Sequence, residues 1–210
     1  MKLTLDRALA AELAELFRSM EAAYDQVAVQ LGHGCDGCPD NCCDSYFTHH
    51  TYIEWAYLWE GLAALPSDLR EMIVERAHQC ELLYQEALAQ GTRPQVMCPL
   101  NDDGRCLVYG HRLMVCRTHG VPAQMTRPDG KIIRFPGCFR CAERVRQWPE
   151  HKTLPVMERT ALLRRLVLLE QRFLQGQRAQ VARLNMTIAR MLTAGPPVRG
   201  ILLSDHSREP

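Results

Sequence analysis

The first thirty residues carry apolar side chains at steps of three and four, the period of an amphipathic helix. Gly32 and Gly34 follow this stripe, and glycine commonly ends a helix. The pattern therefore predicts one helix that ends near Leu31 and leads directly to Cys35. The stripe consists of Leu9, Leu13, Leu16, Phe17, Met20, Tyr24, Val27 and Leu31.

Two more helices are predicted before residue 91. Thr51 and Glu54 have the spacing of a capping box, in which each side chain caps a backbone N–H group of the first turn. A bulky apolar run follows as far as Leu62. Pro66 ends that helix, and the next is expected over residues 68–90.

The pattern changes after residue 92, where apolar runs shorten and Gly and Pro become frequent. A turn at residues 101–104 leads into a short strand-like segment at 106–109. The turn sequence at 127–130 separates two extended segments, 122–126 and 131–135, and predicts a β-hairpin.

Two helices are predicted in the last third of the chain. The first is short and covers residues 138–148, because Pro149 ends it. The second is long and covers residues 155–193, with Pro155 in its first turn and Gly176 near its middle.

These elements predict a single, mainly α-helical domain over residues 1–210. We expect a helical bundle around a small, irregular, cysteine-rich metal-binding centre with a short β-hairpin. The apolar stripes of the first and last helices fit packing against each other, and equally a homodimer or a protein partner. The expected parts are an N-terminal helix (1–34), a cysteine-cluster core (35–145), a long C-terminal helix (146–194) and a tail (195–210).

Composition excludes some classes of partner. The chain has 25 basic and 24 acidic residues, so no general affinity for nucleic acid or for an anionic membrane surface is expected. No apolar run is long enough to cross a bilayer, and the first residues do not form a signal peptide. We therefore expect a cytoplasmic protein, where clustered cysteines indicate metal or redox chemistry rather than disulfides.

All ten cysteines lie between residues 35 and 141, and nine of them, all except Cys80, are candidate metal ligands. Thiolates are soft ligands that suit zinc, copper(I) and iron–sulfur clusters. A C-x-x-C turn directs two sulfur atoms to one ion, and nine cysteines suffice for two four-sulfur sites or for one cluster with extra thiols. The nine form two C-x-x-C pairs, one adjacent pair and three single positions: Cys35 and Cys38, Cys138 and Cys141, Cys42 and Cys43, and Cys98, Cys106 and Cys116.

Two further features of the cysteine segment bear on its chemistry. The side chains of adjacent residues diverge in ordinary backbone geometry, so Cys42 and Cys43 are expected to serve two metals or two roles. Four of the arginines that lie within four residues of a core cysteine can compensate thiolate charge or donate hydrogen bonds to sulfur, although a solvated surface explains each one equally well. They are Arg105, Arg112, Arg117 and Arg140.

Several other residues receive a structural interpretation. Cys80, inside the third helix, is expected to be a small buried apolar residue. His119 is the better candidate for a histidine near the metal, in a supporting position, and His111 is a weaker one. His49 and His50 are expected to face solvent or to cap a helix. The aromatic cluster at residues 55–59 is expected to pack in the core.

The ordered cysteine motifs resemble the YkgJ-like cysteine-cluster family (CxxCxxCC), a zinc- or iron-chelating domain. The resemblance covers residues 35–141 and departs from the family at two points. Three residues instead of two separate Cys38 from Cys42, and His119 stands in a segment where an aromatic residue and proline are typical. The resemblance rests on C-x-x-C-x-x-x-C-C, Cys98-Pro99-Leu100, Gly104-Arg105-Cys106-Leu107-Val108-Tyr109 and Cys116-Arg117.

The resemblance implies eight cysteine ligands, with Cys141 as an additional metal-ligand candidate. Flagellin lysine N-methylases, which are related, favour by analogy an iron–sulfur cluster with a redox or protein-modification role. The alternatives are a zinc-binding structural or metal-handling module without catalysis, and a helix-mediated interaction protein. No catalytic residue is predicted. The eight are Cys35, Cys38, Cys42, Cys43, Cys98, Cys106, Cys116 and Cys138.

Overall fold

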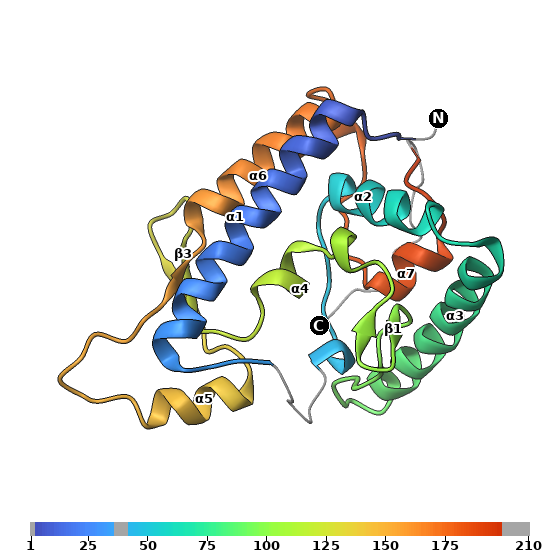
Figure 1. Ribbon diagram of the computed structural model, residues 1–210. Helices are drawn as coiled ribbons and strands as arrows, with labels where there is room; N and C mark the ends of the chain where they lie inside the picture. Colours follow the sequence, from blue (N-terminus) through green and yellow to red (C-terminus); the bar gives the residue numbers. More distant parts are fainter. Residues whose placement is uncertain (1–2, 36–41, 199–210) are drawn as a thin grey trace.

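The computed structural model describes residues 3–35 and 42–198, and this part of the chain is mainly helical, as predicted (Figure 1). Three short 3₁₀ turns, η1 (Cys42–Asp44), η2 (Tyr109–His111) and η3 (Arg178–Gln180), join longer elements. The α-helices are α1 (Arg7–Leu31), α2 (Tyr52–Ala63), α3 (Ser67–Ala89), α4 (Met114–Thr118), α5 (Phe139–Arg146), α6 (Thr160–Phe173) and α7 (Ile188–Thr193).

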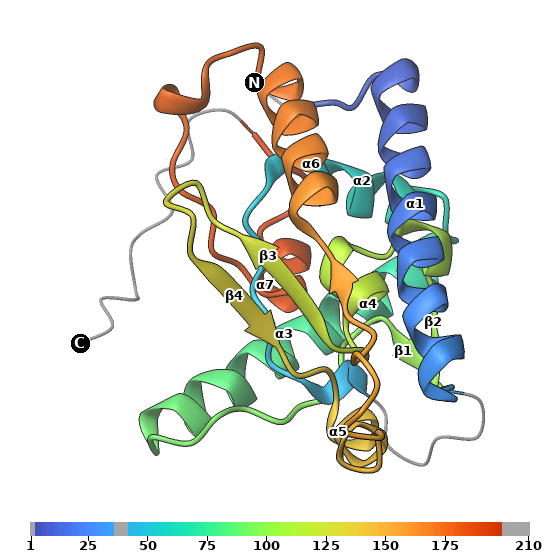
Figure 2. The same ribbon diagram turned by 90° about the vertical axis from the view of Figure 1, so that its left-hand side faces the viewer.

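The strands form two small sheets. β1 (Asn101–Asp102) pairs antiparallel with β2 (Arg105–Cys106). β3 (Ala123–Thr126) and β4 (Ile132–Phe135) form the predicted hairpin, with Ala123 opposite Phe135. An unpredicted strand, β5 (Met157–Glu158), pairs in parallel with β3 and completes the sheet in Figure 2.

The first helix follows the prediction closely. Asp6 caps its start by accepting a hydrogen bond from the Leu9 backbone N–H at 2.8 Å, and Gly32 ends it in the left-handed conformation (φ +59°). Seven of the eight stripe residues are buried within the chain and Tyr24 is half-buried. α1 lies beside α6 in both ribbon views and also contacts α4, so packing against these two helices accounts for most of the stripe.

The start of α2 differs from the predicted capping box. Thr51 makes no capping hydrogen bond to the backbone and instead donates its hydroxyl to Glu54 at 2.6 Å. Glu170 of α6 supplies the cap, because its carboxylate accepts hydrogen bonds from the backbone N–H groups of Tyr52 (3.0 Å) and Ile53 (2.8 Å). A carboxylate at a helix N-terminus is favourable, and this one comes from a distant part of the sequence.

The single long helix predicted over residues 155–193 is wrong. The chain forms β5 and α6, turns through Gln175 (φ +52°) and Gly176 (φ +72°), and becomes helical again only in α7. α7 contacts α3 rather than continuing α6 (Figure 1). The indole N–H groups of Trp55 and Trp59 both donate to the carbonyl of Met191, at 3.0 and 2.9 Å, which fixes α7 against α2.

The core confirms the predicted packing role of the aromatic cluster. Trp55 and Tyr57 are buried among apolar side chains of α1, α2 and α3, and Cys80 is buried on α3 as expected. In the described part of the chain, no helix has both the length and the apolar character needed to cross a bilayer.

Candidate metal centre

Four cysteines from separate segments of the chain lie close to one another. Cys43 lies in η1, Cys98 follows α3, Cys106 ends β2 and Cys116 lies in α4. They are close enough for the charge of one thiolate to raise the pKa of another. Cys106 and Cys43 raise the pKa of Cys116, and these three cysteines all raise the pKa of Cys98. We call these four residues the inner group.

The backbone around the inner group explains why distant cysteines meet. The backbone N–H of Cys98 donates to the carbonyl of Cys43 at 2.9 Å, which ties η1 to the segment that follows α3. The tight β1–β2 hairpin then brings Cys106 back toward Cys98. Gly104 (φ +80°) makes this turn possible, and its N–H is held by the Asn101 side chain at 3.1 Å.

Backbone N–H groups are directed at the inner sulfur atoms. Cys98 accepts from the backbone of Leu100, and Cys106 accepts from the backbone of Val108, the same two-residue step in both cases. Cys116 accepts from the backbone of Leu113. Such hydrogen bonds stabilise thiolates and tune the metal that they bind.

Two side-chain donors lie beside the inner group. Nε of Arg112 is buried and has no hydrogen-bond partner within the described residues, and the Asn101 side chain is hydrogen-bonded to Cys43. Both residues lower the pKa of Cys43, and Arg112 does the same to Cys106 and Cys116. Because an unpaired buried donor is costly, Nε of Arg112 fits an anionic acceptor at this place, such as a metal-bound thiolate.

Without metal, burial governs the protonation of the inner thiols. It raises the pKa of Cys98 and Cys106, and that of Cys116 to about 12, so these three carry protons at neutral pH. Cys43 differs, because a hydrogen bond from Cys42 lowers its pKa to about 6. The side chains of Cys42 and Cys43 are therefore in contact rather than divergent as expected, since the 3₁₀ turn brings them together.

Three other cysteines meet near the end of α1, and we call them, together with His33, the outer group. They are Cys35, Cys138 and Cys141. Nε2 of His33 lies 3.9 Å from Sγ of Cys138, and the backbone N–H of Cys141 donates to the same sulfur at 3.4 Å. Cys35 of the outer group and Cys116 of the inner group both raise the pKa of Cys42, so Cys42 lies between the two groups.

Tyr24 and two glycines position the outer group. The Tyr24 hydroxyl lies 3.7 Å from Sγ of Cys35, and burial together with the nearby thiols raises its pKa. Gly120 and Gly137 allow the chain to pass close by: a Cβ atom on Gly120 would lie 2.6 Å from the Tyr24 hydroxyl, and one on Gly137 would lie 2.6 Å from the carbonyl of Gly120. The N–H of Cys138 donates to that same carbonyl at 3.0 Å.

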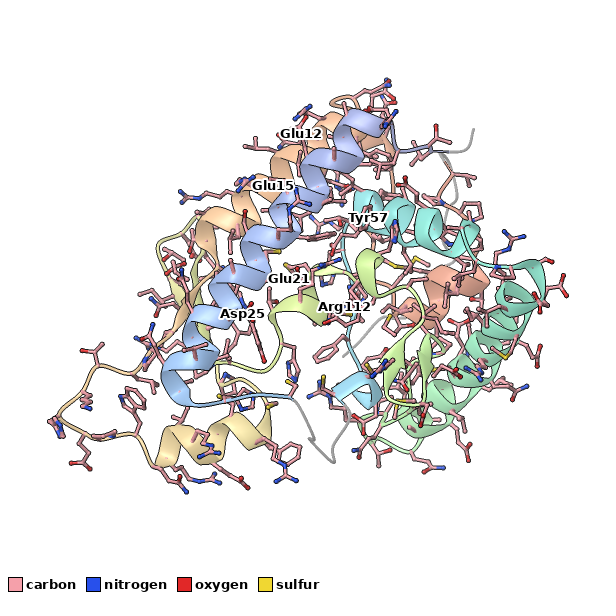
Figure 3. All side chains as sticks on the ribbon, viewed as in Figure 1. Glu12, Glu15, Glu21, Asp25, Tyr57 and Arg112 are labelled. Atoms are coloured by element: carbon pink, nitrogen blue, oxygen red, sulfur yellow. The ribbon has the colours of Figure 1, made fainter. Side chains whose placement is uncertain are left out.

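Charged side chains fix α4, which carries Cys116, against the rest of the fold. Arg117 donates to Glu21 of α1 at 2.6 Å. Arg112, labelled with Glu21 in Figure 3, donates to the same carboxylate at 3.0 Å. From the other side, buried Glu54 accepts a hydrogen bond from the backbone N–H of Met114 at 2.8 Å. Burial raises the pKa of Glu54.

The structure places the predicted ligands in two neighbouring groups. Cys43, Cys98, Cys106 and Cys116 form the inner one, and Cys35, Cys138 and Cys141 contribute to the outer one. Within residues 3–35 and 42–198, however, no three His, Cys, Asp or Glu side chains are arranged to hold an ion as they stand. Cys38 lies outside the described residues.

The predicted histidines have other surroundings. The His119 ring packs on Phe47 with ring centroids 4.8 Å apart, and the His111 ring packs on Tyr57 at 4.5 Å. His50 is exposed, as expected, whereas His49 is buried with 3% of its surface exposed, contrary to the expected solvent-facing or capping role. His33 was not predicted, although its position two residues before Cys35 was a usable signal.

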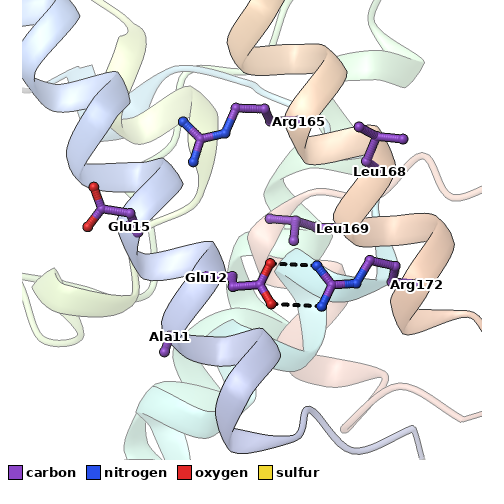
Figure 4. A pocket seen from close by; sticks show the side chains of 7 residues that line it. All are labelled: Ala11, Glu12, Glu15, Arg165, Leu168, Leu169 and Arg172. Atoms are coloured by element: carbon purple, nitrogen blue, oxygen red, sulfur yellow. Dashed lines mark hydrogen bonds and ion pairs between the residues drawn. The ribbon is translucent and has the colours of Figure 1, made fainter.

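A surface cavity lies away from both cysteine groups, between α1 and α6 (Figure 4). Glu12 and Arg172 form an ion pair across it, with Nη2 donating to Oε1 at 2.7 Å, and this hydrogen bonding lowers the pKa of Glu12. No cysteine lines the cavity, so it is separate from the candidate metal centre. Its lining residues are Ala11, Glu12, Glu15, Arg165, Leu168, Leu169 and Arg172.

The donor set of the inner group is of the chemical kind that suits a thiolate-bound metal. Four sulfur atoms, three backbone N–H groups directed at them, the Asn101 side chain hydrogen-bonded to Cys43 and the unpaired Nε–H of Arg112 share one region. Comparison of the chain with protein-family models, with curated proteins and with solved structures gives no match.

Proposed function

We propose that this protein binds metal through cysteine thiolates and carries an iron–sulfur cluster on Cys43, Cys98, Cys106 and Cys116, with a redox or protein-modification role. Four cysteines are the usual ligand set of such a cluster, and hydrogen bonds to sulfur set its reduction potential. The resemblance of residues 35–141 to the YkgJ-like family supports the same proposal. When bound, the cluster would supply one-electron chemistry.

One observation carries the proposal: the donors around the inner group match an anionic acceptor. Protonated thiols are weak acceptors, and the buried Nε–H of Arg112 is unpaired within the described residues, while the Asn101 side chain is hydrogen-bonded to Cys43. Metal binding displaces the thiol protons and leaves sulfur with negative charge that these groups can satisfy. The adjacent cations Arg112 and Arg117 also compensate that charge.

Zinc binding is the second candidate function, and the division of the cysteines into two groups favours it. Tetrahedral zinc takes four ligands, so two groups of about this size suit two separate zinc ions. A closed site of this kind would stabilise the fold or handle metal without catalysis.

Metal analysis of anaerobically purified protein tests the proposal. We expect iron with matching acid-labile sulfide and visible absorption near 400 nm, and we expect Cys106→Ser to lose both. Cys80→Ser is the cysteine control, because Cys80 is a buried α3 residue whose Sγ lies 3.8 Å from the carbonyl of Met97 and belongs to neither group, so the variant should retain full metal content. Zinc without sulfide would support the second candidate, and equal metal content in wild type and Cys106→Ser would contradict a cysteine-ligated inner site.

A further inference from the structure

Resting on the proposed function, we propose that His33, Cys35, Cys138 and Cys141 form a second, separate metal site that binds a zinc-type ion and exchanges it with solvent. Three cysteines and one histidine are an established ligand set for zinc. The four residues come from the end of α1 and the start of α5, elements that contribute nothing to the inner group.

The spacing of His33 and Cys138 fits shared coordination. Nε2 and Sγ lie 3.9 Å apart. Two such ligands on one tetrahedral zinc ion, at ordinary Zn–N and Zn–S bond lengths, lie about 3.6 Å apart. Only a small adjustment therefore separates the observed arrangement of this pair from coordination.

Local structure holds His33 and the two cysteines of α5 in place. Gly32 takes the left-handed conformation at the end of α1, and the N–H of His33 bonds back to the carbonyl of Ala28 at 2.8 Å. At the other element Cys138 caps α5, with its sulfur accepting from the N–H of Cys141. Both ends of the proposed site therefore start from fixed backbone.

Cys35 and Arg144 also suit the proposed site. Cys35 raises the pKa of Cys141, as Cys138 also does, so the three thiols are electrostatic neighbours. Cys35 is exposed, so its side chain can rotate toward an ion at small cost and can also release it. Arg144 of α5 lies close enough to lower the pKa of His33, and its charge offsets the net negative charge of three thiolates on a divalent ion.

The outer site should behave differently from the inner group. The four inner cysteines are all half-buried, and burial is the main cause of the raised pKa values of Cys98, Cys106 and Cys116. The outer site includes an exposed thiol. We therefore expect a chelator to withdraw metal from the outer site at least about tenfold faster than from the inner group.

Reconstitution with zinc alone, followed by release to a colorimetric chelator under anaerobic conditions, tests the inference. Wild type should show a fast and a slow phase. His33→Ala and Cys35→Ser should lose the fast phase and about one zinc ion per chain, whereas Cys106→Ser should lose the slow phase only. His151→Ala is the histidine control, since His151 is exposed on the loop after α5, and Cys80→Ser is the cysteine control.

His33 is half-buried and Cys35 is exposed, so the two substitutions should leave the protein folded. Far-UV circular dichroism verifies this, and a lost fast phase then reports on metal binding. A retained fast phase in both variants overturns the outer site. If Cys35→Ser and Cys38→Ser lose the fast phase of zinc release while His33→Ala keeps it in full, His33 is not a ligand of the outer site. If only Cys106→Ser loses metal, the proposed function is retained and the outer site is rejected. If the wild-type protein binds no metal, the proposed function itself is rejected.

Discussion

Arg117→Ala is expected to lower the free energy of unfolding by about 3 kcal/mol, because it removes a buried cation that satisfies three acceptors. The Arg117 side chain is 6% exposed. It donates to Glu21 at 2.6 Å, to the carbonyl of Gly110 at 2.8 Å and to the carbonyl of Arg112 at 2.7 Å. Its guanidinium also lies over the Phe17 ring, 4.5 Å from the centroid.

The size of the effect follows from what the substitution leaves behind. Two carbonyls lose their side-chain donor in a poorly solvated region. Glu21 is less affected, because its side chain is 33% exposed and keeps its hydrogen bond to Arg112. This places the expected cost at the lower end of the range for breaking a buried ion pair, which is about 3–5 kcal/mol.

Urea unfolding followed by far-UV circular dichroism measures the effect. Arg18→Ala is the matched control, because Arg18 also pairs with a glutamate of α1 but its side chain is 65% exposed, so its loss should cost less than about 0.5 kcal/mol. Arg117→Lys should be intermediate, since lysine keeps the charge but cannot reach all three acceptors at once. Equal stability of Arg117→Ala and Arg18→Ala would contradict the anchoring role assigned to Arg117.

The parts of the fold that the sequence predicted well are those with local causes. The stripe of α1 and the glycine after it define a helix without reference to any other segment. The β3–β4 hairpin is similar, because Pro128-Asp129-Gly130 forms its turn locally. α7 is different: it is placed by α3 and by the indole groups of Trp55 and Trp59, so helical periodicity over residues 155–193 could not show where the chain leaves α6.

The candidate site shows the same division between local and long-range causes. The C-x-x-C pair of Cys138 and Cys141 is local, and the structure keeps these two cysteines together at the start of α5. The grouping of Cys43 with Cys98 depends on backbone pairing between η1 and a segment more than fifty residues later, which spacing does not encode. The positions of Glu54, Tyr24 and His33 beside the cysteine groups likewise depend on how α1, α2 and α4 pack.

Acid should destabilise the protein through His49, and His49→Gln should remove that part of the pH dependence. The residue is buried, and its backbone pairs with Met186 in both directions, at 2.7 and 3.1 Å. Burial, and secondly the neighbouring His50, lower the pKa of His49 from 6.5 to about 3. The folded protein therefore holds this imidazole neutral.

The sign of the effect follows from proton uptake by the unfolded chain. Below pH 6.5 the unfolded chain protonates His49 and the folded protein does not, so stability falls as the pH falls from 6.5 toward 3. At pH 5 the loss from this residue is about 2 kcal/mol. Burial raises the pKa of Glu54 and Glu170, which has the opposite effect, but both residues are present in wild type and in the variant.

Comparing wild type with His49→Gln at two pH values isolates the effect of this one histidine. Between pH 7 and pH 5, wild type should lose about 2 kcal/mol more of its unfolding free energy than the variant, even if the variant is less stable at pH 7. His151→Gln should match wild type, because that side chain is exposed. Parallel pH profiles for wild type and His49→Gln would show that the folded protein accommodates a charged His49. In that case the contact between residues 49 and 186 would have to open below pH 6.5, since a buried imidazolium needs solvent or an anionic partner.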